Sequence, residues 1–356
     1  MKEWYETHER RLSTASLVFG FAFDALTLSR IDSTRDNLWM AANLLIVAIV
    51  IVLLNKQENA SSSKRGESWR HFWLFNILQF GFGAVLGSFF IFYFQSGTLA
   101  VSWPFLLILF AAIVANELFQ KRYTQLAFQL SFFYLALFSY AIFLLPIFLH
   151  RIGASIFVLS GLVSLAGIYL FILILKRLTR EKFRQNRILV IRSITGIFIV
   201  FNILYFTNLI PPIPLSLKEA GVYHLVERDG SGSYVVAGER KGFLSYFHFR
   251  ETVHLVSGDI LYAYSAIFSP ASLDTRIIHE WQYRDEETGE WRTATRIPLV
   301  LSGGRAEGYR TYSVKSNLAA GDWRVNVETP RGQLMGRINF RIIDAEKRPT
   351  LFYRVK

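Results

Sequence analysis

Two unlike halves of the chain meet at the stretch Asn208-Leu209-Ile210-Pro211-Pro212-Ile213-Pro214-Leu215. Three prolines within four residues cannot continue a helix, because proline lacks a backbone donor and fixes φ. They also push the residues before them toward extended geometry. Segments before this stretch are long and apolar, whereas apolar and polar residues alternate after it. The pattern predicts a chain that leaves a membrane at this point and enters a β domain.

Composition narrows the class of protein. Of the 356 residues, 52% are hydrophobic and 32 are phenylalanine, which is typical of a chain with a lipid-facing surface. The formal net charge is +12, but many basic residues stand in short loops between apolar runs. That placement is the positive-inside pattern of membrane proteins and argues against a nucleic-acid partner. The chain has no cysteine, so disulfides, thiolate catalysis and cysteine-based metal sites are excluded.

Seven apolar stretches approach the length of about 20 residues that a helix needs to cross a bilayer. They are residues 12–28, 38–54, 72–94, 99–119, 126–149, 152–175 and 188–210. The first is short and follows Arg10 and Arg11, so it also resembles a secretory signal peptide. Because no small-x-small cleavage site follows it, we interpret it as a retained helix. The predicted fold class for this half is a membrane all-α helical bundle with about seven transmembrane helices.

The distribution of lysine and arginine predicts the orientation of the bundle. Fifteen of these residues lie at one set of helix ends, including the basic cluster 176–187, whereas the opposite loops contain only Arg30, Arg35 and Arg151. Cytoplasmic loops carry the excess of positive charge in membrane proteins. We therefore predict a multi-pass inner-membrane protein with a cytoplasmic N-terminus. After seven crossings, the residues beyond Pro214 lie outside the cytoplasm, which is the periplasm in a Gram-negative cell.

A few polar side chains fall within or near the predicted membrane helices. They are Asp24, Asn43, Gln79, Glu117 and Arg192. An ionisable residue at membrane depth is a functional hypothesis by default, and Asp24 with the two amides is the basis for an alternative function in transport or lipid handling. Glu117 and Arg192 stand near the cytoplasmic boundary and are a candidate pair. The favoured interpretation is structural, because both long side chains can extend to the interface.

The residues after the prolines have the patterning of short strands. The turn signal Asp229-Gly230-Ser231-Gly232 separates the apolar runs 222–227 and 234–239, which predicts a hairpin. Alternation of period two follows in 261–268 and 277–283. Short strands without intervening helices predict an all-β antiparallel sandwich. The predicted domains are a transmembrane bundle at 1–210, a proline-rich junction at 211–217 and an exported domain at 218–356.

The last predicted hairpin has the clearest two-faced pattern. Trp323, Val325 and Val327 alternate with Arg324, Asn326 and Glu328 before the turn Pro330-Arg331-Gly332. Ile338, Phe340 and Ile342 then alternate with Arg337, Asn339 and Arg341. We expect the apolar set to face the core and the polar set to face solvent.

Three ordered motifs in this half resemble a known family. They are His279-Glu280-Trp281, Gly308-Tyr309-Arg310-Thr311-Tyr312-Ser313-Val314-Lys315 and Gly321-Asp322-Trp323-Arg324-Val325. Together they resemble the bacterial domain of unknown function 2914, in which tryptophan is more frequent at the positions of Tyr309 and Tyr312. The resemblance implies an envelope-associated domain, sometimes fused to membrane helices. It implies no established activity and no catalytic residue.

The sequence gives little support for an enzyme. His279-Glu280 lacks the second histidine of the helical zinc-protease motif. The histidines at 224, 248, 254 and 279 lack metal-ligand spacing, and Ser313 is not in a Gly-x-Ser-x-Gly turn. A Ser–His arrangement stays open, because triads assemble in space. We expect no catalytic residue, no metal and no cofactor.

A binding domain is the favoured interpretation of the exported half. The predicted contact residues are His279, Trp281, Tyr309, Arg310, Tyr312 and Lys315. Aromatic faces with cationic groups suit sugars and anionic glycan or lipid headgroups. For Trp281 and Trp323, a position in the core of the sandwich is the favoured interpretation and ligand contact is the alternative. We therefore predict an integral membrane protein whose exported domain binds an envelope glycan, lipid headgroup or protein. Its other partner is the lipid bilayer itself. A sensor is a further alternative, and it would need a separate output partner.

Overall fold

The computed structural model describes residues 33–60, 67–96, 99–118, 125–212, 214–230, 233–240, 251–269, 275–301 and 308–356. The chain divides into two compact units at Leu209–Ile210, with Gln95–Ser102 grouped with the second unit. The predicted span at 12–28, and with it Asp24, lies outside the described residues.

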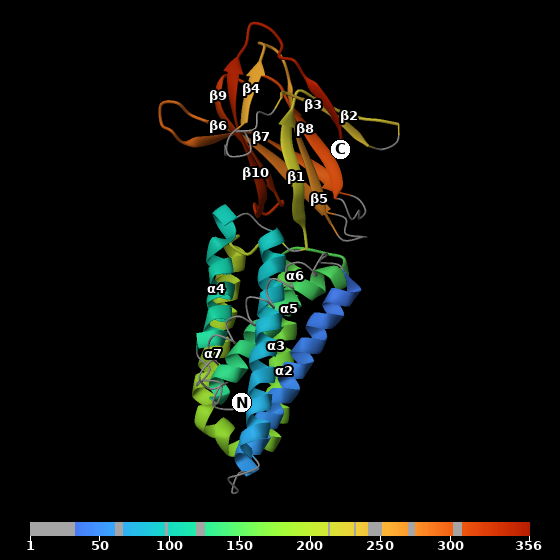
Figure 1. Cartoon of the computed structure of the whole chain (residues 1–356). Coiled ribbons are helices and arrows are strands. Elements are labelled where there is room, and N and C mark those ends of the chain that lie inside the picture. The colour runs from blue at the N-terminus through green and yellow to red at the C-terminus, as the bar shows by residue number, and fades with distance from the viewer. Residues whose placement is uncertain are drawn as a thin grey trace. The chain divides into compact units, whose positions relative to one another are not determined.

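Six helices form the described part of the first unit (Figure 1): α2 (Thr34–Ala60), α3 (Glu67–Ser96), α4 (Leu99–Leu118), α5 (Leu126–Leu149), α6 (Ala154–Leu178) and α7 (Arg180–Phe206). Five of them, all except α4, contain a segment long and apolar enough to cross a membrane. The apolar segment of α4 is Ser102–Asn116, which rises about 22 Å against a hydrocarbon core of about 30 Å. The predicted count of seven spans is therefore not supported.

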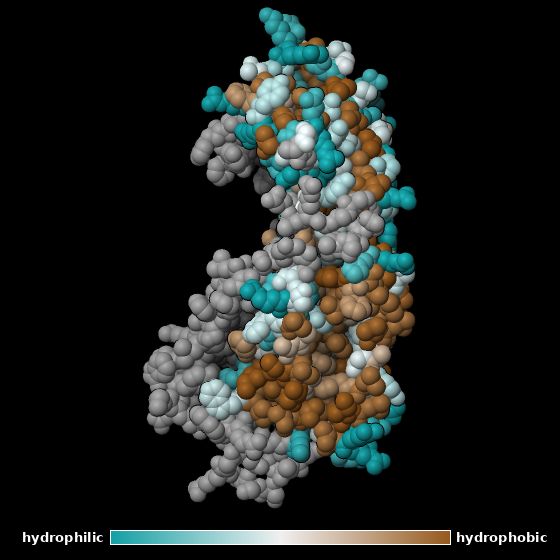
Figure 2. All heavy atoms as spheres, turned by 90° about the vertical axis from the view of Figure 1, so that its right-hand side faces the viewer, coloured by the Kyte–Doolittle hydropathy of each residue, from teal (hydrophilic) through white to brown (hydrophobic). Residues whose placement is uncertain are grey.

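The helices extend beyond the apolar stretches that predicted them. α6 and α7 are separated by Thr179 alone, so most of the basic residues between 176 and 187 are helical and do not form a loop. Hydropathy locates only the part of a helix that suits hydrocarbon, whereas backbone hydrogen bonding continues until a cap ends it. Figure 2 shows hydrophobic side chains gathered over the helical unit, as expected of a lipid-facing surface.

The local sequence explains where α7 ends. Asn208 has φ 59°, and asparagine is one of the few residues that tolerate this left-handed conformation. The N–H of Leu209 donates to the carbonyl of Leu204 at 2.8 Å, and that of Asn208 to the carbonyl of Tyr205 at 3.1 Å. These two bonds form a Schellman cap. The prolines that follow prevent the helix from resuming.

Small residues allow close packing within the bundle. A Cβ atom at Gly161 on α6 would lie 3.0 Å from Phe198 on α7 and 3.5 Å from Phe138 on α5. A Cβ atom at Gly81 on α3 would lie 2.7 Å from the Val47 side chain on α2. Both glycines therefore serve packing between helices of one chain.

The second unit contains eleven strands in its described part: β1 (Ser216–Tyr223), β2 (Leu225–Arg228), β3 (Tyr234–Gly238), β4 (Glu251–Leu255), β5 (Leu261–Phe268), β6 (Thr275–Arg284), β7 (Trp291–Leu301), β8 (Tyr309–Lys315), β9 (Gly321–Glu328), β10 (Leu334–Asp344) and β11 (Phe352–Val355). They form three sheets with the orders β1-β5-β8, β4-β10-β9-β6-β7 and β11-β3-β2.

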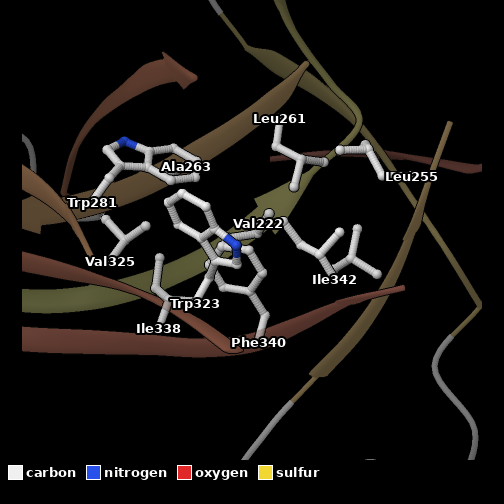
Figure 3. Close-up of a cluster of buried hydrophobic side chains, with 11 residues drawn as sticks. Val222, Leu255, Leu261, Ala263, Trp281, Trp323, Val325, Ile338, Phe340 and Ile342 are labelled. Atoms are coloured by element: carbon white, nitrogen blue, oxygen red, sulfur yellow. The ribbon is translucent and has the colours of Figure 1, made fainter. Parts of the chain in front are cut away.

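The central strand β5 of the β1-β5-β8 sheet is buried on both faces. One face of β5, with Leu261 and Ala263, packs against the five-stranded sheet in a core that includes Trp281 and Phe340 (Figure 3). The other face, with Tyr264 and Ala266, packs against Val226 and Val236 of the small β11-β3-β2 sheet. The domain is thus a sandwich with a third layer, which explains why nearly every residue of β5 is buried.

Two details differ from the predicted antiparallel sandwich. β4 pairs with β10 in parallel, next to antiparallel neighbours, so the domain is antiparallel-rich and not wholly antiparallel. The predicted strand 222–227 is also divided at His224, where the chain passes from β1 in one sheet to β2 in another. Neither detail has a local signal, because strand partners come from distant parts of the chain.

The last hairpin confirms the apolar half of its predicted pattern, whereas Asn326 and Glu328 of the polar half are buried instead of facing solvent. β9 and β10 pair in antiparallel register with Trp323 opposite Phe340 and Val325 opposite Ile338. The predicted core positions on both strands are buried. The chain turns at Thr329–Gly332, where Gly332 has φ 82°.

Candidate functional site

The five-stranded sheet has one apolar and one polar face. Ile277, His279 and Trp281 of β6 lie on the core face, so the alternate residues of the same strand lie on the opposite face. The side chains that interact there define what we call the polar face: Glu280, Gln282, Thr293, Arg296, Arg324, Asn326, Glu328 and Arg337. They come from the four adjacent strands β7, β6, β9 and β10.

Strand register brings these side chains together. Glu280 of β6 is opposite Asn326 of β9 and Arg296 of β7. Gln282 is opposite Arg324, and Asn326 is opposite Arg337 of β10. Directly opposed residues have Cβ atoms about 5 Å apart, so polar side chains in this register are within hydrogen-bonding reach.

Glu280 and Asn326 form the centre of the polar face. The two carboxylate oxygens of Glu280 accept hydrogen bonds from Thr293 Oγ1 at 2.8 Å and from Asn326 Nδ2 at 3.0 Å. Asn326 Oδ1 accepts from Arg337 Nε at 2.7 Å, and Gln282 Oε1 accepts from Arg324 Nε at 2.6 Å. The side chains of Glu280 and Asn326 are buried although they lie on the outward face. The long side chains around them exclude water, which strengthens these bonds.

Glu328 is a second buried carboxylate on the polar face. Its Oε1 accepts a hydrogen bond from Arg296 Nη2 at 2.5 Å. Burial raises the pKa of Glu328 to about 7, and the negative charge of Glu280 adds to the increase, whereas Arg296 opposes it. This carboxyl group therefore changes charge near neutral pH.

The arginines of the polar face are held in fixed positions. The guanidinium of Arg324 lies 4.2 Å from the ring centroid of Trp291, which is a cation–π contact. Burial lowers the pKa of Arg324 to about 10, and the positive charge of Arg337 contributes to the decrease. Burial also lowers the pKa of Arg337. Both groups stay charged at neutral pH while repelling each other.

His279 and Trp281 lie on the opposite, core face of β6. Both side chains are fully buried. His279 Nε2 is 2.8 Å from Ser265 Oγ, and its Nδ1 is 2.9 Å from Ser313 Oγ, which also accepts from Trp281 Nε1 at 3.0 Å. Burial lowers the pKa of His279 to about 4. The neutral ring therefore donates to one serine and accepts from the other.

This internal network is the Ser–His arrangement that the fold forms. The two serines do contact the histidine, but Ser265 is fully buried and Ser313 nearly so. A nucleophile must reach its substrate, and the described structure encloses these groups in the core. His279 and Trp281 are buried core residues in this structure, and neither side chain is exposed.

The four other predicted contact residues lie on β8 and divide between its two faces. Tyr309 and Lys315 share the face of Ser313, and Lys315 Nζ donates to Thr295 Oγ1 at 2.9 Å. Arg310 and Tyr312 occupy the opposite face, because side chains alternate along a strand. Tyr312 there contacts the rings of Tyr234 and Tyr262. The six predicted residues therefore do not converge on one surface.

Three of the predicted intramembrane residues, Asn43, Gln79 and Arg192, have described side chains. Asn43 Nδ2 donates to the carbonyl of Trp39 in its own helix at 2.9 Å. The backbone carbonyl of Gln79 accepts a hydrogen bond of 3.0 Å from Asn116 Nδ2 of α4. Arg192 is exposed on α7. The side chain of Glu117 lies outside the described residues, so the proposed pair with Arg192 stays a prediction.

One contact between two of the candidate membrane helices was not predicted. Asn55 Nδ2 of α2 donates to Gln129 Oε1 of α5 at 2.6 Å, and both residues are buried. A hydrogen bond of this kind is typical of packing between helices in lipid. Both residues lie near predicted helix ends, where an amide is unremarkable in sequence, so composition alone could not select them.

A second polar cluster joins the sheets elsewhere in the domain. Glu239 Oε1 is 3.1 Å from His224 Nε2, and its Oε2 is 2.7 Å from His254 Nδ1. Burial is the largest single influence on the pKa of Glu239 and raises it. Hydrogen bonds from both histidines outweigh burial, so the pKa is lowered overall. Within the described ranges, no group of three or more histidine and acidic residues has the arrangement of a metal site.

The polar face was only partly visible in the sequence. Arg324, Asn326, Glu328 and Arg337 were expected to face solvent, but their role as one network with Glu280 and Gln282 was missed. The available signal was the alternation of polar residues on several strands that proved to be adjacent. Their adjacency is a property of the sheet and not of any one strand.

Comparison with known proteins supports the family resemblance. Residues 274–342 match the family described as Protein of unknown function (DUF2914), a range that contains the whole polar face. No curated protein matches the chain.

Two solved structures with weak similarity add nothing to the family match. A β-glucosidase from Listeria innocua in complex with gluconolactone has 10% identity and a TM-score of 0.20, over 31% of this chain and 16% of that chain. The alkylpurine DNA glycosylase AlkC of Pseudomonas fluorescens, bound to DNA containing an abasic site analogue, has 10% identity and a TM-score of 0.22, over 85% of this chain and 96% of that chain. Likenesses this weak carry no argument about function.

Proposed function

We propose that this chain is an integral inner-membrane protein whose β domain lies in the periplasm and binds an envelope component through its polar face. The observation that carries the proposal is the polar face itself. Eight interacting polar side chains from four strands are fixed by hydrogen bonds on the outward side of a sheet. A preorganised polar surface loses little conformational entropy when a ligand binds.

The membrane part of the proposal rests on hydropathy and charge. Five described helices have the length and composition of membrane spans. The basic residues Lys176, Arg177, Arg180, Arg184 and Arg187 gather at the junction of α6 and α7, which favours a cytoplasmic position for that junction.

We favour binding over catalysis because of where the reactive groups lie. The Ser–His contacts are enclosed in the core, and on the polar face both oxygens of Glu280 accept hydrogen bonds from neighbouring side chains. The alternative function in transport or lipid handling gains no specific support, since the described contacts of Asn43 and Asn55 lie within or between helices.

Capture of envelope components by the full chain in nanodiscs tests the proposed function. Glycans, lipids and proteins retained by the chain are identified by mass spectrometry. Asn326→Ala removes the amide that joins Glu280 to Arg337, so we expect it to lose the component that the original chain captures. Thr350→Ala is the control, because Thr350 is exposed and is not one of the side chains of the polar face.

Folding of each variant is checked by its unfolding midpoint, since loss of Asn326 also leaves buried partners unpaired at about 1–3 kcal/mol. Capture of nothing by the original chain, or equal capture by the folded Asn326→Ala variant, would contradict the proposal.

A further inference from the structure

Arg324 and Arg337 are diagonal neighbours on the polar face. Arg337 of β10 is opposite Asn326 of β9, and Arg324 is two residues before Asn326 on the same face. Diagonal neighbours in an antiparallel pair have Cβ atoms about 7–8 Å apart, within reach of long side chains. The two guanidinium groups can therefore approach one group placed between them.

Each guanidinium is held by its Nε atom. Arg324 Nε donates to Gln282 Oε1, and Arg337 Nε donates to Asn326 Oδ1. Asn326 Nδ2 also approaches Gln282 Oε1 at 3.4 Å, so the two anchoring amides are linked. Within the described part of the chain, the Nη groups of both arginines have no hydrogen-bond partner. As whole residues, Arg324 is half-buried and Arg337 is exposed.

Charge on the polar face is unbalanced at this point. Arg296 pairs with Glu328, which leaves Arg324 and Arg337 against the single carboxylate of Glu280. The Glu280 oxygens already accept hydrogen bonds from Thr293 and Asn326. The positive charge of each arginine is thus only partly offset by protein groups, and an anion would complete the arrangement.

We infer that Arg324 and Arg337 form a clamp for a phosphate or carboxylate group carried by the envelope component. The inference rests on the proposed function and names the chemistry that the polar face recognises. Guanidinium groups match these planar or tetrahedral anions through paired N–H donors. Fixing the Nε atoms leaves the paired Nη donors at the end of each side chain, pointing away from their anchors. Such a group can come from a lipid headgroup or from a soluble anionic sugar.

Titration of the full chain with inorganic phosphate tests the clamp. The chain is held in phosphatidylcholine nanodiscs at constant ionic strength, and binding is followed by calorimetry. We expect Arg324→Gln and Arg337→Gln each to weaken phosphate binding about tenfold or more, because a charge-assisted hydrogen bond contributes enough for that change. Arg337→Lys keeps the charge but loses the paired donors, so it should give an intermediate affinity.

Arg354→Gln is the matched control. Arg354 is exposed on β11, which belongs to another sheet. Its substitution removes the same charge and should leave phosphate affinity unchanged. An equal loss in Arg354→Gln would show a general charge effect and overturn the clamp. Acetate is titrated in the same way, and absence of binding of both phosphate and acetate by the original chain would overturn the clamp as well.

Two further probes distinguish the sources of the anion. Flotation with phosphatidylglycerol vesicles reports a lipid headgroup, and titration with glucose 6-phosphate or glucuronate reports a soluble sugar. The Arg324→Gln/Arg337→Gln double variant should abolish whichever signal occurs. If the chain captures an envelope component and this double variant captures it equally, the clamp fails while the proposed function stands. If the original chain captures nothing, the proposed function fails.

Discussion

Two buried titratable side chains of the five-stranded sheet, His279 and Glu328, both favour their neutral forms. Burial lowers the pKa of His279 from 6.5 to about 4 and raises the pKa of Glu328 from 4.5 to about 7. The consequences for stability have opposite signs. In the unfolded chain His279 takes up a proton below pH 6.5 that the folded domain refuses, so stability is lost on acidification toward pH 4. The folded Glu328 keeps a proton that the unfolded chain releases above pH 4.5, so stability is lost as the pH rises toward 7.

The two effects overlap between pH 4.5 and 6.5 and nearly cancel. Glu328→Gln removes one of them. We expect the free energy of unfolding of the variant's β domain to rise with pH across this window, by about 2–3 kcal/mol in total, at about 1.4 kcal/mol per pH unit. Denaturant unfolding of the full chain, followed at several pH values, measures the slope.

His279→Asn provides the opposite control. Its free energy of unfolding should fall as the pH rises through the same window, and the double variant should lose both slopes. If Glu328→Gln has the same pH dependence as the original chain, Glu328 does not hold a proton near neutral pH in the folded domain.

At the scale of elements, the start of β8 depends on one glycine. Gly308 has φ 96°, and a Cβ atom there would lie 3.2 Å from backbone atoms of Ala266 and Ile267 in β5. This close approach of two backbones sets the position of β8, which carries Ser313 and four of the six predicted contact residues. Gly258 also has a positive φ, of 88°, but nothing lies within 4 Å of its Cβ position.

The two glycines make a matched pair. Gly258→Ala should cost only the left-handed backbone strain of about 1–2 kcal/mol. Gly308→Ala should cost at least about 1 kcal/mol more, because crowding against a fixed backbone is added to the same strain. Unfolding midpoints of the β domain measure the difference. Equal losses would mean that β8 can move away from β5 without cost.

Element boundaries show how far sequence patterns reach. The ends of β9 and β10 follow from alternation and a Pro-Arg-Gly turn, and α7 ends where Asn208 and the prolines require. By contrast, α7 begins at Arg180, eight residues before its predicted start. Charged residues at a membrane boundary continue a helix as readily as they form a loop, so hydropathy cannot locate that end.

At the scale of the whole molecule, orientation does not depend on the corrected number of spans. The basic junction of α6 and α7 and the β domain are separated by α7 alone, and α7 contains one candidate membrane span. If the positive junction is cytoplasmic, a single crossing places Ile210 and the residues after it on the other side. The earlier helices do not enter this argument.

The absence of cysteine from the chain allows a direct test. Thr350→Cys in the β domain and Gln185→Cys in the basic junction are both exposed positions. We expect a membrane-impermeant maleimide to label the cysteine at position 350 in intact spheroplasts. It should label the cysteine at position 185 only after the membrane is permeabilised. The reverse pattern, or protection of both positions until permeabilisation, would contradict an exported domain.

The sequence by itself determined the features that arise from neighbouring residues. Apolar runs of membrane length, the proline boundary, the alternation in β9 and β10 and the family resemblance all depend on residues close together in the chain. Hydrophobic burial and backbone sterics act on such local patterns directly, so they are legible before any fold is known.

Only the tertiary structure decided which strands are neighbours. Ser265 and Ser313 lie 14 and 34 residues from His279 in the sequence, yet their hydroxyl groups contact its two ring nitrogens. With both nitrogens paired, His279 is a core residue and not a surface contact. Likewise, Glu280 meets Asn326 and Arg337 only because β6, β9 and β10 pair in this order. Side-chain alternation states that a residue faces outward, but the sheet supplies its partners. The polar face, and with it the Arg324–Arg337 clamp, is therefore a product of strand order and register.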